Sequence, residues 1–148
     1  MSQTHSVSQT ISSQEVLRKY KVVAVVGASK TPEKEAYKVP LYLKQHGYKV
    51  IPINPTADMI LEEKAYPNLS ELPPEVARQV DFVNIFRPSE ELPQVAQQVI
   101  DMHKKYGRPF VFWSQLGLEN EEAKQMLSKN KIPYVMNACT RVVHRMIS

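Results

Sequence analysis

Cysteine, glycine and tryptophan are scarce in this chain of 148 residues, which has one cysteine, four glycines and one tryptophan. A lone cysteine, Cys139, excludes a disulfide within the chain and argues against a zinc site built from cysteines. The four histidines are scattered and show no metal-ligand spacing, so we predict no metal site. Because structural disulfides are typical of secreted proteins, this cysteine usage fits a reducing, cytoplasmic location.

Long apolar stretches are also missing. No segment approaches the roughly 20 apolar residues that a membrane-spanning helix needs, and no basic region followed by an apolar one opens the chain. A Walker loop and a G-x-S-x-G nucleophile elbow are absent too. We therefore expect neither membrane insertion nor secretion, and no catalytic motif points to an enzyme.

The excess of positive charge is small. Nineteen Lys and Arg against fifteen Asp and Glu give a net charge of +4. Such a charge attracts a polyphosphate and a nucleic acid equally well. Since the sequence shows no recognition helix and no RNA-binding aromatic pair, we do not expect nucleic acid as a partner.

The length and composition predict one globular domain. Hydrophobic residues make up 43% and charged residues 23%, as in average soluble proteins. Residues 1–12 are polar and without periodicity, so we expect a mobile N-terminal tail followed by a single domain over residues 13–148.

Short apolar segments alternate with amphipathic ones, which is typical of β-α units. Strands are predicted over residues 21–26, 48–53, 80–86, 109–113 and 132–136, and helices over residues 12–20, 36–46, 90–106, 119–130 and 140–147. This alternation predicts an α/β fold with a Rossmann-like, doubly wound, parallel five-stranded sheet in the order 3-2-1-4-5 and helices on both faces.

Three local features complete this expectation. Pro40 is tolerable in its helix only within the first turn. Ser89 is the expected N-cap of the third predicted helix. Residues 56–75 contain three prolines and are predicted to be irregular, with one helical turn near residues 57–61.

Ligands of such sheets bind outside the carboxyl ends of the strands, so the residues after each strand are the candidate site. Gly27, Ala28 and Ser29 follow the first strand, where a glycine lets backbone approach an anion closely, and this predicts a seat for a phosphate or diphosphate. Only one glycine of the G-x-G-x-x-G fingerprint is present. Asn54-Pro55 follows the second strand, where an NAD-binding domain has an acid, so NAD is disfavoured.

Lysines surround the first loop. Lys30 and Lys34 fit a solvated loop as well as a phosphate site. Lys38 is expected near a helix N-terminus, where the helix dipole disfavours a cation unless an anion is close, so ligand binding is the favoured reading.

Three residues at the ends of the other strands each have two possible roles. Arg87 fits a bidentate phosphate clamp and equally an ion pair with Glu90 or Glu91. Trp113 could floor a pocket for an aromatic base, although the core is the safer assignment. Cys139 is either a small buried hydrophobe or a reactive thiol at the start of the last helix.

Five blocks in register carry a family resemblance: Val-Val-Gly-Ala-Ser at 25–29, His-Gly-Tyr-Lys-Val-Ile-Pro-Ile-Asn-Pro at 46–55, Val-Asp-Phe-Val-Asn-Ile-Phe-Arg at 80–87, Trp-Ser-Gln-Leu-Gly at 113–117 and Asn-Ala-Cys-Thr at 137–140. Together they resemble the small CoA-binding protein family, whose members are relatives of the N-terminal, CoA-binding domain of the succinyl-CoA synthetase α subunit. The resemblance covers residues 20–145 and departs from the family at Leu61-Glu62-Glu63, which lacks the usual glycine.

The resemblance implies a Rossmann-like domain that holds coenzyme A, with the diphosphate near Gly27, Ala28 and Ser29 and the nucleotide portion along the ends of the second and third strands. Lys38 matches a basic residue that reaches phosphate, and relatives carry a cysteine at the position of Cys139. The residues expected to bind CoA are Gly27, Ala28, Ser29, Lys30, Lys38, Ile53, Asn54, Pro55, Phe86, Arg87 and Trp113.

The expected function is therefore binding of CoA or an acyl-CoA without turnover, with thiol–disulfide exchange at Cys139 as a further hypothesis. The alternative is an NAD(P)-dependent oxidoreductase or a CoA-transferring enzyme completed by a partner chain. A homodimer and an unidentified enzyme partner are the protein partners we consider.

Overall fold

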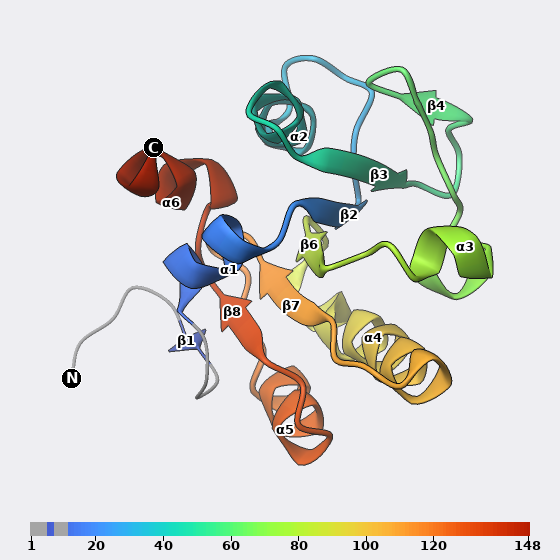
Figure 1. The fold of residues 1–148 in the computed structure, drawn as a ribbon, viewed down its shortest axis with the longest axis vertical. Helices are drawn as coiled ribbons and strands as arrows, with labels where there is room; N and C mark the ends of the chain where they lie inside the picture. Colours follow the sequence, from blue (N-terminus) through green and yellow to red (C-terminus); the bar gives the residue numbers. More distant parts are fainter. Residues whose placement is uncertain (1–5, 8–11) are drawn as a thin grey trace.

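A parallel sheet forms the centre of the computed structural model, which describes Ser6–Val7 and residues 12–148 (Figure 1). Its parallel strands are β2 (Val22–Val26), β3 (Lys49–Ile53), β6 (Phe82–Ile85), β7 (Val111–Ser114) and β8 (Tyr134–Met136). They lie in the order β3-β2-β6-β7-β8, and β1 (Ser6–Val7) pairs antiparallel with β8 at the edge. The predicted α/β, Rossmann-like fold class is confirmed.

The position of β6 differs from the predicted order. Numbered along the chain, the five parallel strands lie in the order 2-1-3-4-5, because β2 pairs with β3 on one side and with β6 on the other. The order 3-2-1-4-5 would place β6 beside β3. An apolar run shows that a strand is buried, but it does not show which strand is its neighbour.

Helices cover both faces of the sheet, as predicted (Figure 1). On one face lie α1 (Ser13–Lys19), α2 (Glu35–Gln45) and α6 (Thr140–Ile147). On the other lie α3 (Pro74–Ala77), α4 (Leu92–Tyr106) and α5 (Glu121–Lys129), together with the short 3-10 helices η1 (Leu69–Glu71) and η2 (Ser89–Glu91). The five predicted helices correspond to α1, α2, α4, α5 and α6.

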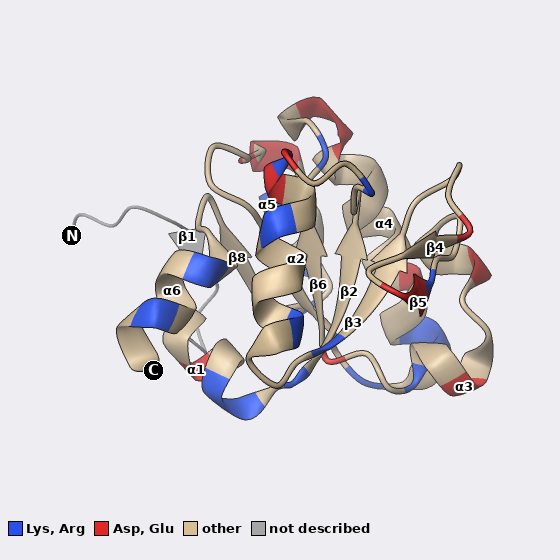
Figure 2. Cartoon of the chain, turned by 90° about the horizontal axis from the view of Figure 1, so that it is seen from above, with Lys and Arg blue, Asp and Glu red and all other residues tan. Residues whose placement is uncertain are grey.

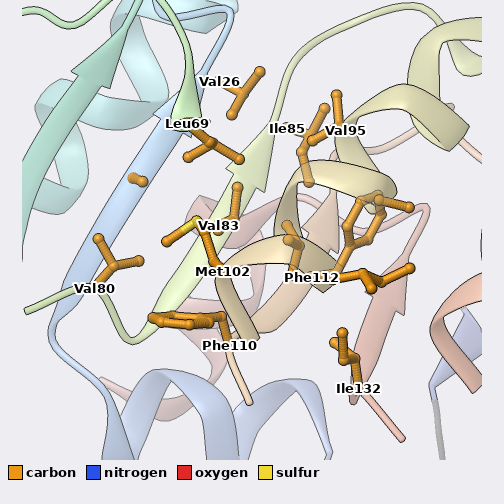
Figure 3. Close-up of a cluster of buried hydrophobic side chains, with 14 of the residues drawn as sticks. Val26, Leu69, Val80, Val83, Ile85, Val95, Met102, Phe110, Phe112 and Ile132 are labelled. Atoms are coloured by element: carbon orange, nitrogen blue, oxygen red, sulfur yellow. The ribbon is translucent and has the colours of Figure 1, made fainter. Parts of the chain in front are cut away.

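Alternate residues of β2 feed two separate cores. Val23 and Val25 pack in the cluster on the α1, α2 and α6 face, whereas Ala24 and Val26 pack in the cluster on the α4 and α5 face. Figure 3 shows the second cluster, in which Val26 lies near Val95 of α4. A strand with apolar side chains on both faces must lie inside a covered sheet, which is why its sequence reads as a continuous apolar run.

Two helix caps test the expected helix boundaries. Ser12 caps α1 by accepting a hydrogen bond from the N–H of Glu15, as predicted. Ser89 does not cap its helix, because its hydroxyl oxygen accepts a bond from the N–H of Glu119 (3.1 Å) and Glu91 precedes α4 instead. A contact between distant segments has taken the hydroxyl that the local pattern assigned to the cap.

A hairpin replaces the helical turn predicted near residues 57–61. β4 (Met59–Ile60) pairs antiparallel with β5 (Glu63–Lys64), and the two turn residues Leu61 and Glu62 have positive φ angles of 55° and 66°. Such two-residue turns usually contain Gly or Asn, so the signal that announces them is absent here. The segment that lacks the family's glycine therefore turns with two strained residues.

Part of the predicted N-terminal tail belongs to the sheet, since Ser6 and Val7 pair with Met136 and Val135 of β8. Residues 1–5 and 8–11 lie outside the described residues. Within Ser6–Val7 and residues 12–148, no helix has both the length and the apolar character needed to cross a membrane. A single domain over residues 13–148 stays a prediction.

Two histidines that are far apart in the sequence meet between α2 and α6. The ring of His144 lies 5.3 Å from that of His46, and a 2.8 Å hydrogen bond joins His144 Nδ1 to the hydroxyl of Tyr42. Burial is the main cause that lowers the pKa of His144, and the charges of His46 and Lys21 lower it further. Their spacing in the sequence gave no sign of this cluster.

The lowered pKa of His144 predicts acid sensitivity. The unfolded chain binds a proton at its ordinary pKa of about 6.5 more readily than the folded chain does, so the free energy of unfolding should decrease as the pH falls below about 6.5. Urea unfolding from pH 7.5 to 5.5 measures this slope. His144→Gln should flatten it and His103→Gln, on α4, should not; equal slopes in all three proteins would contradict the assignment.

Candidate functional site

The loops that leave β2 and β6 part at the carboxyl edge of the sheet. The chain goes from β2 to α2 on one face and from β6 to α4 on the other, so this is the point at which the strand order reverses. A cavity of about 490 Å³ lies there. Its walls are residues 26–29 at the end of β2, residues 53–55 at the end of β3, residues 67–68, residues 86–87 after β6, and parts of α2 and α4.

The floor of the cavity is the top of the core. Val26 and Val95 line the cavity and also belong to the core cluster on the α4 face, where Figure 3 shows them beside Ile85. Because core side chains are close-packed, the floor is fixed in place. A ligand in this cavity would rest on a rigid apolar base.

Gly27 brings the β2 and β6 loops into contact. Its φ is +86°, and a Cβ at this position would lie 3.0 Å from Cδ of Arg87 and 3.1 Å from the carbonyl oxygen of Phe86. The conformation favours glycine, and a Cβ would be tightly placed, so that Arg87 or Phe86 would have to shift by a few tenths of an ångström. The stem of Arg87 passes over the loop that we expect to hold a phosphate.

Pro40 ties the next part of this loop to α2. It lies inside the helix, five residues after Glu35, and not in the first turn as the sequence led us to expect. Since proline has no N–H, the carbonyl of Ala36 has no helical donor. The N–H of Ser29 donates to that carbonyl at 3.1 Å, so the helix interruption is what anchors the loop.

The start of α2 has free capacity for an anion. Lys34 is the N-cap residue and makes no side-chain cap, so no side chain of the cap accepts from the first-turn N–H groups. The positive end of the helix dipole lies at this turn, and Lys34 and Ala36 line the cavity. The Ser29 oxygen accepts from the N–H of Thr31 at 3.0 Å, which leaves its hydroxyl proton for a ligand.

Asn54 holds the β3 loop against the β2 loop. Its amide nitrogen donates to the carbonyl of Ala28 at 2.9 Å, and its amide oxygen accepts from the N–H groups of Thr56 and Ala57. These bonds use both ends of the amide. Asn54 thus shapes the cavity wall and does not offer the carboxylate that would bind the ribose of NAD.

Arg87 is paired with one acid. Its Nε donates to Glu91 Oε1 at 3.1 Å and its Nη2 to Glu91 Oε2 at 3.0 Å, and both residues line the cavity. Of the two readings of Arg87 from the sequence, the ion pair is the one formed here, with Glu91 and not with Glu90. Figure 2 shows side by side both signs of charge at the end of the molecule toward which β2 points.

Eight of the expected binding residues line the cavity: Gly27, Ala28, Ser29, Ile53, Asn54, Pro55, Phe86 and Arg87. Three others do not. Lys30 and Lys38 are exposed outside it, and Trp113 is fully buried in the core, where its Nε1 donates to the carbonyl of Ala138. Trp113 is corrected to a core residue, because a ligand cannot reach a side chain with no exposed surface.

Lys34 takes the place that we expected for Lys38. The helix begins at Glu35, so Lys34 is the N-cap and Lys38 lies a turn further along. Cys139, the candidate thiol, is the half-buried N-cap of α6 and is not a lining residue. Lys34, one turn before Lys38, is therefore the lysine that lines the cavity.

Sequence reasoning missed the wall formed by the connection after β5 and by α4. Pro67, Asn68, Glu91, Gln94 and Gln98 line the cavity there. The usable signal is the spacing of Glu91, Gln94 and Gln98, which places their side chains on one side of a helix that follows the third predicted strand.

Comparison with known proteins identifies the family. The model of the CoA binding domain matches residues 21–145. The chain belongs to this CoA-binding domain family. The family resemblance seen in the five sequence blocks is thereby confirmed.

Two full-length similarities agree with the family. The chain is 39% identical over 130 residues to the uncharacterized protein YneT of Bacillus subtilis, covering 88% of this chain and 90% of that protein. It superposes with a TM-score of 0.80 and 31% identity on the structure of cell-free ID.343 from Thermus thermophilus, covering 93% and 100% of the two chains. Neither protein's name states an activity.

A partial similarity connects this CoA-binding family member with an enzyme. The chain is 43% identical over 77 residues to ADP-forming acetate–CoA ligase II of Archaeoglobus fulgidus. The match covers 51% of this chain and 11% of the ligase. The ligase therefore contains much that this chain does not match.

Pro40→Ala tests the anchoring of the loop. The new N–H at position 40 would compete for the Ala36 carbonyl, so the amide proton of Ser29 should exchange about two- to tenfold faster, as expected for one weakened hydrogen bond. Thermal stability should not fall, because a helix-breaking proline is removed. Pro93→Ala, at the start of α4, is the matched control and should leave Ser29 exchange unchanged. Unchanged exchange in Pro40→Ala would refute the anchoring role.

Proposed function

We propose that the chain binds coenzyme A or an acyl-CoA in the cavity between the β2 and β6 loops and does not itself turn the ligand over. The observation that carries this proposal is the position of an anion-accepting cavity at the switch point of a sheet that belongs to the CoA-binding domain family. The ligase of Archaeoglobus fulgidus, which is 43% identical to this chain over 77 residues, has CoA in its name, and this supports CoA as the ligand.

The charged side of the cavity suits the diphosphate. Gly27 allows close approach of backbone, Ser29 has a hydroxyl proton to donate, and Lys34 and Arg87 supply cations beside the N-terminus of α2. Helix N-termini with such loops are common anion sites. The diphosphate is therefore assigned to Gly27, Ala28 and Ser29 in this proposal.

Other residues of the lining suit the nucleotide portion. Ile53, Pro55 and Pro67 give apolar surface, and Gln94 adds a neutral amide group. A flat heteroaromatic base is held by this combination of apolar contact and neutral hydrogen bonding. The cationic and the apolar lining residues together match a ligand that has both anionic and aromatic parts.

Binding is favoured over turnover by the residues that line the cavity. Its ionisable side chains are Lys34, Arg87 and Glu91, and the lining includes neither His nor Cys. Nucleophilic catalysis needs a nucleophile beside a base, and general acid–base catalysis is most often the work of histidine. The alternative is an NAD(P)-dependent oxidoreductase or a CoA-transferring enzyme completed by a partner chain. The partial matches to CoA ligases support its second form, the CoA-transferring enzyme.

Isothermal titration of the purified protein tests the proposal. CoA should bind more tightly than NADP, and NAD should not bind, because Asn54 stands where an NAD site has a carboxylate. Gly27→Ala should weaken CoA binding about tenfold or more, since the Cβ displaces Arg87 or Phe86 at the proposed phosphate seat.

Gly117→Ala is the matched control. Its φ is also +86° but a Cβ there meets nothing within 4 Å, so the two variants share the backbone strain and differ in the collision. Both should lose stability, by about 1 kcal/mol or more from the strain, and only Gly27→Ala should lose CoA affinity. No CoA binding by the unaltered protein at millimolar concentration, or tighter binding of NADP, would refute the proposed function.

Thiol exchange at Cys139 stays a prediction. With CoA disulfide as the second reactant, the Cys139 thiolate would attack one sulfur and expel the other half as CoA thiolate, so no external oxidant is needed. Intact-mass spectrometry should then show one CoA adduct on the unaltered protein and none on Cys139→Ser. An unmodified protein after prolonged incubation would end this hypothesis. A cytoplasmic location, a homodimer and an enzyme partner likewise remain predictions.

A further inference from the structure

The cavity contains an acid where the proposed ligand is an anion. Among its lining residues the charged side chains are Lys34, Arg87 and Glu91. CoA carries several negative charges on its phosphates, so Glu91 opposes the ligand unless it has another role. In the structure, Glu91 contacts Arg87.

The contact uses one edge of the Arg87 guanidinium, formed by Nε and Nη2. Two parallel N–H···O bonds, from Nε and Nη2 of Arg87 to the two carboxylate oxygens of Glu91, form the bidentate arrangement with which arginine also binds phosphate. While the Nε and Nη2 N–H groups donate to Glu91, they cannot donate to a second anion. A phosphate that binds this edge of the guanidinium therefore competes with Glu91.

The pair is easy to break and the arginine stays near the loop when it breaks. The side chains of Arg87 and Glu91 are 46% and 37% exposed, and ion pairs with such exposure contribute little to stability. The stem of Arg87 is packed over Gly27, with Cδ 3.0 Å from where a Cβ would be. Only the outer part of the side chain has to turn to reach an anion above residues 27–29.

We infer that Glu91 is an affinity-setting residue that holds Arg87 in the empty cavity and is displaced by the ligand's phosphate. This inference rests on the proposed function for the identity of the ligand. Glu91 makes ligand binding weaker than Lys34 and Arg87 alone would give. It also favours ligands with enough negative charge to displace Glu91 from Arg87.

Charge-neutralising variants measure the competition. By titration calorimetry at low salt, Glu91→Gln should bind CoA about three- to tenfold more tightly, since it frees Arg87 and removes a like charge. Arg87→Gln should bind CoA more weakly. Glu90→Gln is the matched control. Glu90 is an exposed neighbour that does not line the cavity, and its replacement removes one negative charge, as Glu91→Gln does.

The double variant Arg87→Gln with Glu91→Gln separates the mechanism from general electrostatics. If Glu91 acts through Arg87, most of the gain from Glu91→Gln should disappear when Arg87 is absent. The same gain in both backgrounds, an equal gain in Glu90→Gln, or weaker binding by Glu91→Gln would each overturn the inference.

A second probe separates this inference from the proposed function. Inorganic pyrophosphate carries the diphosphate chemistry without the nucleotide, and Glu91→Gln should tighten its binding by a similar factor. Pyrophosphate binding that follows this pattern without any CoA binding would support the role of Glu91 and contradict the CoA assignment. CoA binding that is unaffected by Glu91→Gln would do the reverse.

Discussion

The close approach of the β2 and β6 loops at Gly27 is the constraint on which the site depends. β2 pairs with β3 on one side and β6 on the other, so three loops leave the sheet at one place. A side chain at position 27 would meet the backbone of Phe86 and the stem of Arg87. At Gly27 these loops meet while their helices leave toward opposite faces, and the cavity lies at this place.

The rest of the wall is held by bonds that link separate loops. The N–H of Ser29 bonds to the Ala36 carbonyl that Pro40 leaves free, and the Asn54 amide bonds to the Ala28 carbonyl. Each bond fixes the β2 loop to a different neighbour, one to α2 and one to the β3 loop. A preformed loop loses less conformational entropy when a ligand binds, so these interactions act on affinity without touching the ligand.

The sequence predicted the helices and strands better than it predicted which strands pair with each other. Continuous apolar runs and helical spacing identified the five parallel strands and the five main helices, because both patterns report burial, which is local information. The position of β6 beside β2 and the hairpin at Leu61-Glu62 were not predicted. Strand pairing depends on contacts between distant segments, and the hairpin turn lacks the glycine that usually marks one.

For the candidate site too, local patterns in the sequence were informative and contacts between distant segments were not predicted. Residues directly after strands, such as Gly27, Asn54 and Arg87, were found because parallel strands bring their carboxyl ends to one edge. Trp113 was kept among the expected binding residues because its position at the end of a strand does not tell which way its side chain points. It lies in the core, which was the safer assignment. The pairing of Arg87 with Glu91 required the geometry, since Glu90 was an equal candidate by sequence.

The most direct test of the account is an amide NMR titration of the isotopically labelled protein with CoA. The account predicts that the largest shift changes fall on Gly27, Ala28, Ser29 and Arg87, at the place where the β2 and β6 loops meet. Shift changes confined to α6, or to the β4–β5 hairpin, with these four amides unmoved would contradict it.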